Sequence, residues 1–435
     1  MTTIPKACAM PRVLLSLFFT LNVLRGEAPP NIVMIVSDDH AWTDYGFMGH
    51  AEIKTPHLDK LAAQSITYRR GYVTSSLCCP SLATIVTGLY PHQHRITSND
   101  PPANKGVVPG VPKLDPPPFK AGRERMNVYM DNAPSLPRLL GQKGYVSLQT
   151  GKWWQGNFKR GGFTEGMTRG QRHGDAGLDI GRKTMEPIFD FMSRAKKEGK
   201  PFLVWYAPLL PHDPHTPPER LLEKYKAKSP SIHIAKYWAM VEWFDETCGQ
   251  LMRQLEKEGL SEKTIVVYVA DNGWIQSADD PRYAPKSKQS QYDGGLRTPI
   301  MIRWPAKTKP AQPEALASSI DIAPTILKAA GVEVPNDMSG LNLLDPEAVG
   351  KRDAIFGGCY THESMDLEVP AKSLRWRWGI QGNLKLMLPG PNEPDAPVEL
   401  YDLKADPSEQ KNLAQDRAAD VAGLRSAIDG WWKGE

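Results

Sequence analysis

Short runs of consecutive apolar residues recur along the chain, and each run ends in polar residues or a turn. The runs cover Asn31 to Asp39 (NIVMIVSDD), Pro201 to Pro208 (PFLVWYAP) and Thr264 to Gly273 (TIVVYVADNG). Runs of β-branched residues that do not alternate with polar ones are typical of strands buried on both faces, as in a parallel sheet. We therefore predict that these runs are central strands of one mostly parallel sheet.

Amphipathic segments with helical spacing lie between the predicted strands. They include residues 55–65 (TPHLDKLAAQS), 135–144 (SLPRLLGQKG) and the long segment 235–259. Alternating strands and helices predict an α/β fold, in which a large, mostly parallel mixed sheet is sandwiched by helices. Residues 101–118 are too rich in proline for a regular element, and we expect a surface insertion there.

The pattern changes near residue 345. Residues 374–388 (LRWRWGIQGNLKLML) alternate like the two strands of a hairpin, residues 399–414 are rich in turn formers, and residues 420–432 have helical character. We therefore predict a large α/β domain over residues 27–345 and a smaller C-terminal α+β subdomain over residues 346–435. The subdomain should contain a small antiparallel sheet and a packed helix.

The first 26 residues have the features of a signal peptide. Lys6 and Arg12 precede an apolar run from Val13 to Leu24, which is short for a bilayer span but suits the apolar region of a secretory signal. The alternative is a buried strand or helix of the mature fold. The signal peptide predicts export to the periplasm or the extracellular space, without a stable membrane anchor.

Charge and cysteine content exclude some classes of function. The formal net charge is +4, and the lysines and arginines are scattered rather than gathered into a basic stripe, so nucleic acid is not an expected partner. The chain has five cysteines, too few to form a disulfide scaffold in a chain of this length. We expect at least one of them to serve chemistry.

Polar residues stand at the ends of two predicted strands. Asp38 and Asp39 end the first strand, and Asp271 and Asn272 follow the last one. The carboxyl ends of parallel strands form the functional crevice of open α/β sheets, and oxygen ligands suit Ca²⁺ or Mg²⁺. Capping of turns would explain one such pair, but two pairs in one sheet favour a cation site.

Cys78 and Cys79 directly precede a predicted helix over residues 81–87. The N-terminus of a helix stabilises anions and lowers the pKa of a thiol, which would make Cys78 reactive. Considered alone, however, an inert, buried cysteine is the better interpretation, since free cysteine is among the most buried residue types.

Cationic side chains also follow predicted strands or lie in polar loops. Lys152, His212 and Lys288 are of this kind. Solvated lysines and a structural histidine are the ordinary interpretation. Next to a divalent metal, however, they could surround a tetrahedral oxyanion ester such as a sulfate or phosphate ester.

The ordered series of motifs resembles the sulfatase family of the alkaline phosphatase superfamily. From about residue 30 to 430, the chain contains NIVMIVSDD, CCPS, GKW, PHDPH, VADNG, DGGLRTP and ELYDLKADPSEQKNLA in that order. The resemblance implies an alkaline-phosphatase-like fold. It also implies hydrolysis of sulfate esters in a sulfated saccharide or another sulfated small molecule.

The resemblance implies a role for each motif residue. Cys78 would be converted by a formylglycine-generating enzyme into formylglycine, whose hydrate would be the nucleophile. Lys152, Lys288 and His212 would bind the sulfate group, and His212 would donate a proton to the leaving alcohol. The ligands of Ca²⁺, or of Mg²⁺ in its place, would be Asp38, Asp39, Cys78, Asp271 and Asn272.

Two positions depart from the family pattern. Leu82 stands where Cys-x-Pro-x-Arg has its arginine, and Trp154 stands where Gly-Lys-Trp-His has its histidine. Two alternatives to an active sulfatase therefore stay open. They are a catalytically impaired protein that binds sulfated glycans, and a hydrolase of phosphodiesters or phosphonate monoesters. Candidates to replace the lost groups are Arg95, Arg172 and His173.

Overall fold

The computed structural model describes residues 1–4, 28–102 and 117–435. Most of the predicted signal peptide and most of the Pro-rich stretch 101–118 lie outside the described residues. The end of that stretch, Pro117 and Pro118, belongs to helix α4 (Pro117–Asn132) rather than to a loop, because proline is tolerated in the first turn of a helix. Within the described part of the chain, no helix has the length and apolarity needed to cross a membrane.

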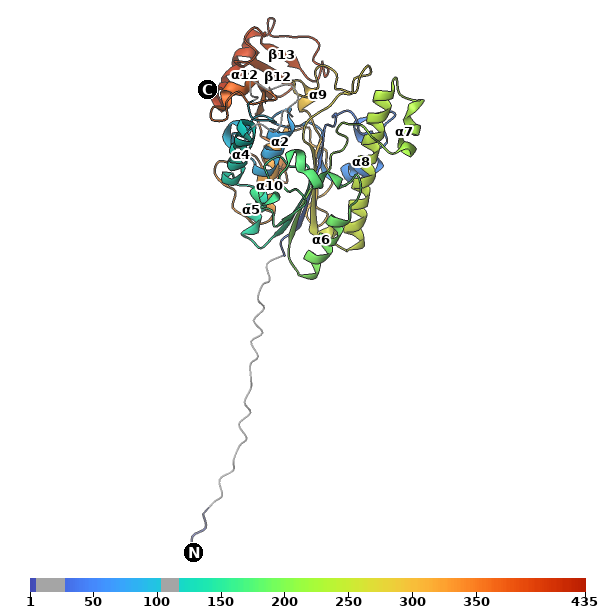
Figure 1. Ribbon diagram of the computed structural model, residues 1–435. Helices are drawn as coiled ribbons and strands as arrows, with labels where there is room; N and C mark the ends of the chain where they lie inside the picture. The colour runs from blue at the N-terminus through green and yellow to red at the C-terminus, as the bar shows by residue number, and fades with distance from the viewer. Residues whose placement is uncertain (5–27, 103–116) are drawn as a thin grey trace.

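A seven-stranded mixed sheet with the order β2-β8-β7-β1-β6-β4-β5 forms the centre of the molecule (Figure 1). The strands predicted from the sequence are β1, β6 and β7, and β1 pairs in parallel with both of the others. Strand β4 continues the parallel part, whereas β8 is antiparallel to β7. This arrangement confirms the predicted α/β fold. The bounds are β1 (Asn31–Ser37), β2 (Ile66–Tyr68), β4 (Val146–Gly151), β5 (Glu165–Gly166), β6 (Phe202–Ala207), β7 (Thr264–Ala270) and β8 (Ile300–Arg303).

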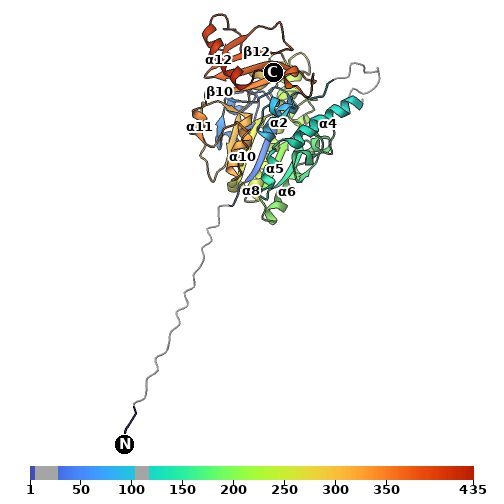
Figure 2. The ribbon, with the colours of Figure 1, turned by 90° about the vertical axis from the view of Figure 1, so that its left-hand side faces the viewer.

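Helices cover both faces of this sheet, as the two views in Figures 1 and 2 show. Helices α2, α4, α5 and α10 lie on one face, and α1, α6 and α8 lie on the other, with α7 packed against α8. Their bounds are α1 (Pro56–Ala63), α2 (Cys78–Thr87), α5 (Leu136–Gly141), α6 (Glu186–Lys197), α7 (Glu219–Lys226), α8 (Ile232–Lys257) and α10 (Ile322–Ala329).

Strand β1 illustrates how the sequence pattern produces these layers. Its apolar residues alternate between two cores: Ile32 and Met34 pack under α2 and α10, whereas Val33 and Ile35 pack under α1 and α8. Successive side chains of a strand point to opposite faces, so a strand that is apolar at every position must be covered on both.

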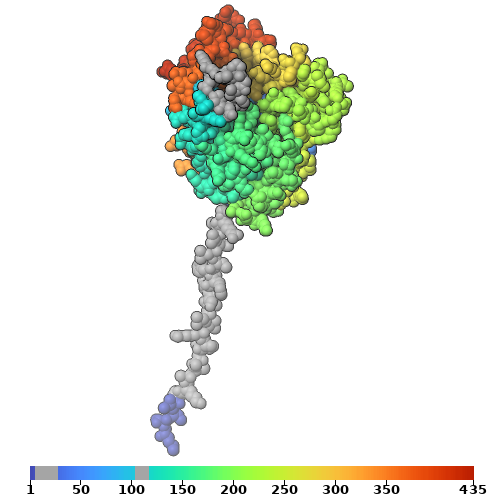
Figure 3. Space-filling view, viewed as in Figure 1, coloured from blue at the N-terminus to red at the C-terminus, as the bar shows by residue number. Residues whose placement is uncertain are grey.

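A second, four-stranded antiparallel sheet with a packed helix forms the C-terminal part of the chain, as predicted. Its residues make up the upper end of the molecule in the view of Figure 3. The domain boundary near residue 345 stays a prediction. The elements of this part are β10 (Ala354–Tyr360), β11 (Leu374–Gln381), β12 (Leu384–Pro389), β13 (Glu399–Asp402) and α12 (Ala418–Trp431), and the remaining short elements are β3 (Gly71–Tyr72), β9 (Ala317–Ser318), α3 (Pro91–His94), α9 (Asp293–Leu296) and α11 (Pro346–Gly350).

Gly151 allows two strand ends to approach closely beside the carboxyl edge of the sheet. It ends β4 with a positive φ of 76°, and a Cβ at this position would lie 1.9 Å from the carbonyl oxygen of Ala207 at the end of β6. The next residue, Lys152, donates its backbone N–H to the same oxygen at 2.6 Å. Glycine at this position therefore allows the backbone of β4 to approach β6 closely enough for Lys152 to form this hydrogen bond.

We expect Gly151→Ala to lower the free energy of unfolding by about 3 kcal/mol or more, because it adds a clash with backbone to the cost of a positive φ. Gly144→Ala is the matched control: its φ is 81°, and a Cβ there would meet no atom within 4 Å. The control should cost about 1 kcal/mol. Urea denaturation measures both values, and equal losses would contradict the close approach at Gly151.

Candidate active site

The residues that the sequence singled out for chemistry form one cluster at the carboxyl end of the parallel strands. Most come from segments that follow a strand, Cys78 comes from the start of a helix that faces those segments, and Lys288 comes from the loop between β7 and α9. They are Asp38 and Asp39 after β1, Lys152 after β4, His212 after β6, Asp271 and Asn272 after β7, Lys288 before α9, and Cys78 at the start of α2.

Buried ion pairs hold the centre of this cluster. Lys152 Nζ lies 2.6 Å from Asp38 Oδ1 and 3.8 Å from Asp271 Oδ2. Lys288 Nζ lies 2.7 Å from Asp39 Oδ2. All five side chains are at most 8% exposed, so three carboxylates and two ammonium groups share one buried site with a net charge of −1.

The excess of negative charge perturbs the carboxylates. Burial and the neighbouring Asp271 carboxylate raise the pKa of Asp38 to about 7. Burial acts in the same direction on Asp39, but the ammonium group of Lys288 holds the pKa of that carboxyl well below its ordinary value. A buried carboxylate with a raised pKa lacks sufficient positive charge around it, and a bound cation would supply that charge.

Unpaired oxygens also indicate a cation site. Among the described residues, Asp38 Oδ2, Asp271 Oδ2 and Asn272 Oδ1 are buried without a hydrogen-bond partner. Asn272 uses its Nδ2 to donate to Asp39 Oδ1 at 2.7 Å. Buried polar atoms without partners are costly, and oxygens are the ligands that Ca²⁺ and Mg²⁺ prefer. The side chains present therefore fit a divalent cation.

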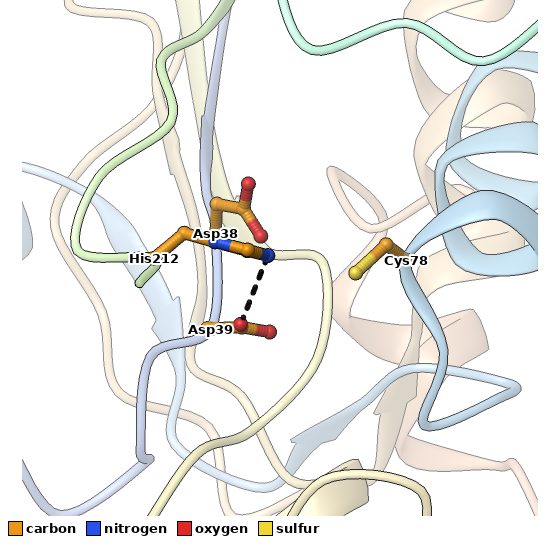
Figure 4. A group of neighbouring side chains, drawn as sticks. All are labelled: Asp38, Asp39, Cys78 and His212. Carbon is orange, nitrogen blue, oxygen red and sulfur yellow. Dashed lines mark ion pairs between the residues drawn. The ribbon is translucent and has the colours of Figure 1, made fainter. Parts of the chain in front are cut away.

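His212 and Cys78 approach the same point from opposite sides. Figure 4 shows the Cys78 side chain facing Asp38, Asp39 and His212, and one ligand atom from each of these four residues lies within 4.8 Å of the others. His212 Nε2 lies 3.4 Å from Asp39 Oδ2, and its Nδ1 lies 2.9 Å from Asp213 Oδ1. His212, expected to act as a proton donor, is thus also close enough to serve as a metal ligand.

The surroundings of Cys78 agree with an inert, buried thiol and not with a thiol whose pKa the helix N-terminus lowers. Cys78 does lie at the N-terminus of α2, but its side chain is buried within the core, and this burial raises the pKa of the thiol well above its ordinary value. Burial destabilises the thiolate by more free energy than the helix N-terminus and the nearby lysines stabilise it. The unmodified thiol is therefore poorly suited to attack an ester.

A pocket of about 530 Å³ opens over the cluster, and its lining includes Cys78, His212 and Lys288. Sequence reasoning missed several of its other residues, although one of them, Gln289, directly follows Lys288. Those residues are Asn99, Arg282, Tyr283, Gln289 and His362.

The two departures from the family pattern have different surroundings. Leu82 is 2% exposed and belongs to the hydrophobic core, so no polar group takes the place of the arginine there. Trp154 lines the pocket together with Arg172 and His173. Arg95, in contrast, lies away from this pocket and pairs with Glu368 at 3.6 Å.

Hydrogen bonds and ion pairs join the segment that carries Lys288 to the C-terminal part of the chain. Lys385 of β12 is fully buried, and its Nζ donates to Asp293 Oδ1 and to Glu409 Oε1, each at 2.9 Å. Glu409 Oε2 accepts the backbone N–H of Asp293 at 2.7 Å, and the backbone oxygen of Glu409 accepts from Lys286 Nζ. The C-terminal sheet therefore helps to position a cationic residue of the pocket.

Two family models match the chain. The model described as Sulfatase matches residues 30–332, and the model described as N-sulphoglucosamine sulphohydrolase, C-terminal, matches residues 286–426. The matches overlap over residues 286–332, which include Lys288 and the residues around it. The overlap therefore contains Lys286 and Asp293, the residues through which the Lys288 segment contacts the C-terminal part of the chain.

Individual proteins show the same relationship. The chain is 24% identical over 443 residues to an ulvan-active sulfatase of Formosa agariphila, covering 88% of this chain and 77% of that protein. It is 28% identical over 374 residues to arylsulfatase A of Homo sapiens, covering 74% and 68%. A protein solved with its substrate D-glucosamine-2-N,6-O-disulfate has the same fold, with a TM-score of 0.75, 20% identity, and coverage of 93% and 98%.

We expect Lys385→Met to lower the free energy of unfolding by about 3 to 5 kcal/mol, because Asp293 and Glu409 would keep buried charges without their shared counter-charge. The control is Lys351→Met, which removes an exposed ion pair with Glu347 in which the lysine side chain is 74% exposed. That change should cost about 0.5 kcal/mol or less. Chemical denaturation of both variants tests the difference, and a loss for Lys385→Met as small as that of the control would contradict it.

Proposed function

The chain belongs to the sulfatase family, and on this premise we propose that it hydrolyses sulfate esters of carbohydrates with a bound Ca²⁺ and a formylglycine at position 78. The observation that carries the proposal is the meeting of three carboxylates, two lysines and residue 78 at one buried point below a pocket. A relative named for activity on ulvan, and a structure with a sulfated glucosamine, support a saccharide as the substrate.

The proposed ligands of the Ca²⁺ are those predicted from the sequence, with Mg²⁺ as the alternative ion. When bound, the cation supplies positive charge beside the oxygens of the ester. It changes the net charge of the carboxylates and lysines from −1 to +1, which favours an anionic substrate. These ligands are Asp38, Asp39, residue 78, Asp271 and Asn272.

The lysines and His212 act on the ester itself. With the carboxylates engaged by a cation, Lys152 and Lys288 can donate to sulfate oxygens instead of pairing with Asp38 and Asp39. His212 contributes to sulfate binding and donates a proton to the oxygen of the leaving alcohol. The hydrated aldehyde of formylglycine supplies the oxygen nucleophile that the protonated thiol lacks.

Maturation and export belong to the same proposal. A formylglycine-generating enzyme would modify Cys78, and the signal peptide over residues 1–26 would direct the protein to the periplasm or the extracellular space. The C-terminal subdomain would complete the active site, because its sheet holds the Lys288 segment and His362 lines the pocket.

Mass spectrometry of the tryptic peptide Gly71–Arg95, from protein made in its own host, should show an aldehyde in place of the Cys78 thiol. Cys78→Ala should lower turnover of sulfate esters by about 10⁴-fold or more. Cys79→Ser is the control, because Cys79 is equally buried and its sulfur accepts from Gln155 Nε2 at 3.0 Å, a bond that serine can keep.

Two outcomes of this experiment would decide for the alternatives. If matured, calcium-loaded protein leaves a broad panel of sulfate esters intact but binds sulfated glycans, the protein is a non-catalytic binder. If it cleaves a phosphodiester or a phosphonate monoester faster than the matched sulfate ester, the reaction class is wrong.

Removal of the metal with EDTA, which chelates both Ca²⁺ and Mg²⁺, should abolish turnover, and added Ca²⁺ should restore it, because the metal-free cluster is negatively charged and engages both lysines. Calcium should also raise the unfolding temperature, since saturation at 100 times its Kd stabilises the folded state by about 2.7 kcal/mol. Parallel titrations with Mg²⁺ identify the preferred ion. Unchanged activity and unchanged unfolding temperature after chelation would refute the cation site.

A further inference from the structure

One wall of the active-site pocket carries more positive than negative charge. Its centre is Asp100, whose side chain is 8% exposed and pairs with two guanidinium groups. Arg172 donates from Nε to Asp100 Oδ1 at 3.1 Å and from Nη2 to Oδ2 at 3.0 Å, and Arg123 Nη2 also donates to Oδ1. One carboxylate therefore balances only one of two fixed positive charges.

The two arginines differ in what they face. Arg172 lines the pocket with Cys78, whereas Arg123 does not. The Arg172 guanidinium lies over the ring of Trp154, 4.8 Å from its centroid, where cation–π attraction favours it. Its hydrogen bonds to Asp100 use Nε and Nη2, and within the described part of the chain its Nη1 has no hydrogen-bond partner.

His362 adds a second donor on the same wall. It comes from the C-terminal part of the chain, lines the pocket, and places its Nδ1 4.0 Å from Asp100 Oδ2. Its Nε2 accepts a hydrogen bond from Asn99 Nδ2 at 3.4 Å, so the proton of the neutral ring, and with it the donor, is on Nδ1. Arg172 and His362 thus approach one carboxylate from two distant parts of the sequence.

Neutralising Asp100 does not require both arginines. Arg123 alone would do so, and the Arg172 guanidinium, whose side chain is 30% exposed, therefore adds a positive charge that faces the pocket without a carboxylate of its own. The only carboxylate that lines the described pocket, Asp213, already pairs with His212. No acidic residue of the described pocket lining is therefore available to Arg172.

We infer that Arg172 and His362 form a subsite for a second anionic group of the substrate, a carboxylate or a further sulfate, beside the sulfate ester that residue 78 attacks. The inference rests on the proposed function and narrows it to saccharides with at least two anionic groups. Arg172 is the specificity-determining residue, because it offers an oriented donor with a permanent charge.

The test is calorimetric titration of calcium-loaded Cys78→Ala protein with matched pairs of saccharides. One pair is glucosamine 6-O-sulfate and D-glucosamine-2-N,6-O-disulfate. The other is N-acetylgalactosamine 6-sulfate linked either to glucose or to glucuronic acid. The first pair tests a second sulfate and the second pair a carboxylate. We expect the member with two anionic groups to bind roughly 10- to 100-fold more tightly in at least one pair.

Variants separate the subsite from general effects. Arg172→Gln should remove the preference and leave the affinity for the monoanionic member unchanged, whereas Arg172→Lys should keep part of the preference. The matched control is Arg125→Gln on α4, because Arg125 is 46% exposed, pairs with Glu368 and does not line this pocket. It removes the same charge and should keep the full preference, which should decline as salt is added.

The inference is overturned if neither pair shows tighter binding of the dianionic member, or if Arg172→Gln keeps the preference. It is also overturned if Arg172→Gln weakens both members of a pair equally, because that result indicates a structural role. Binding to Cys78→Ala protein does not require turnover. Failure of the subsite is therefore distinguishable from failure of the proposed hydrolysis, which matured wild-type protein tests.

Discussion

Burial of three carboxylates at the carboxyl end of one sheet is the constraint on which the rest of the site depends. Asp38, Asp39 and Asp271 follow strands that are adjacent and parallel, so their side chains lie close together. Water does not reach them, and their charge must be compensated by groups from other segments. Lys152 and Lys288 do so in part, and the remaining negative charge and unpaired oxygens explain why the site suits a divalent cation.

The same requirement ties the small C-terminal sheet to the large one. Lys385 brings a positive charge from β12 to Asp293 and Glu409, next to the segment that presents Lys288 to the pocket. Because this contact is fully buried, separating the two parts of the chain would leave Lys385 and Asp293 without their ion pair, at a cost in free energy. Residues from both parts of the chain line the pocket, and His362, between β10 and β11, is the contribution of the C-terminal part.

Positive charge is distributed around this pocket in an unusual way for the family pattern. At position 82, where the pattern has arginine, an apolar leucine fills the core beneath Cys78. The ring of Trp154, the residue that replaces the pattern's histidine, lies next to two arginines, of which Arg172 lines the pocket and Arg123 does not. The charge next to residue 78 is thus smaller than the pattern implies, and the charge at the rim has its own local cause in the shared carboxylate of Asp100.

The sequence by itself determined the local properties of the chain. Uninterrupted apolar runs identified β1, β6 and β7, and the polar residues at their ends identified the cluster, because strand burial and strand direction follow from the pattern of a few neighbouring residues. Only the tertiary structure decided properties that depend on distant segments. One is the raised pKa of the Cys78 thiol, because burial raises this pKa more than the helix N-terminus lowers it. Another is the presence of Arg172 and His173, but not Arg95, at the pocket. Asn99, His362 and Lys385 carry no local signal either, since their roles arise from contacts across tens or hundreds of residues that only the folded chain brings together.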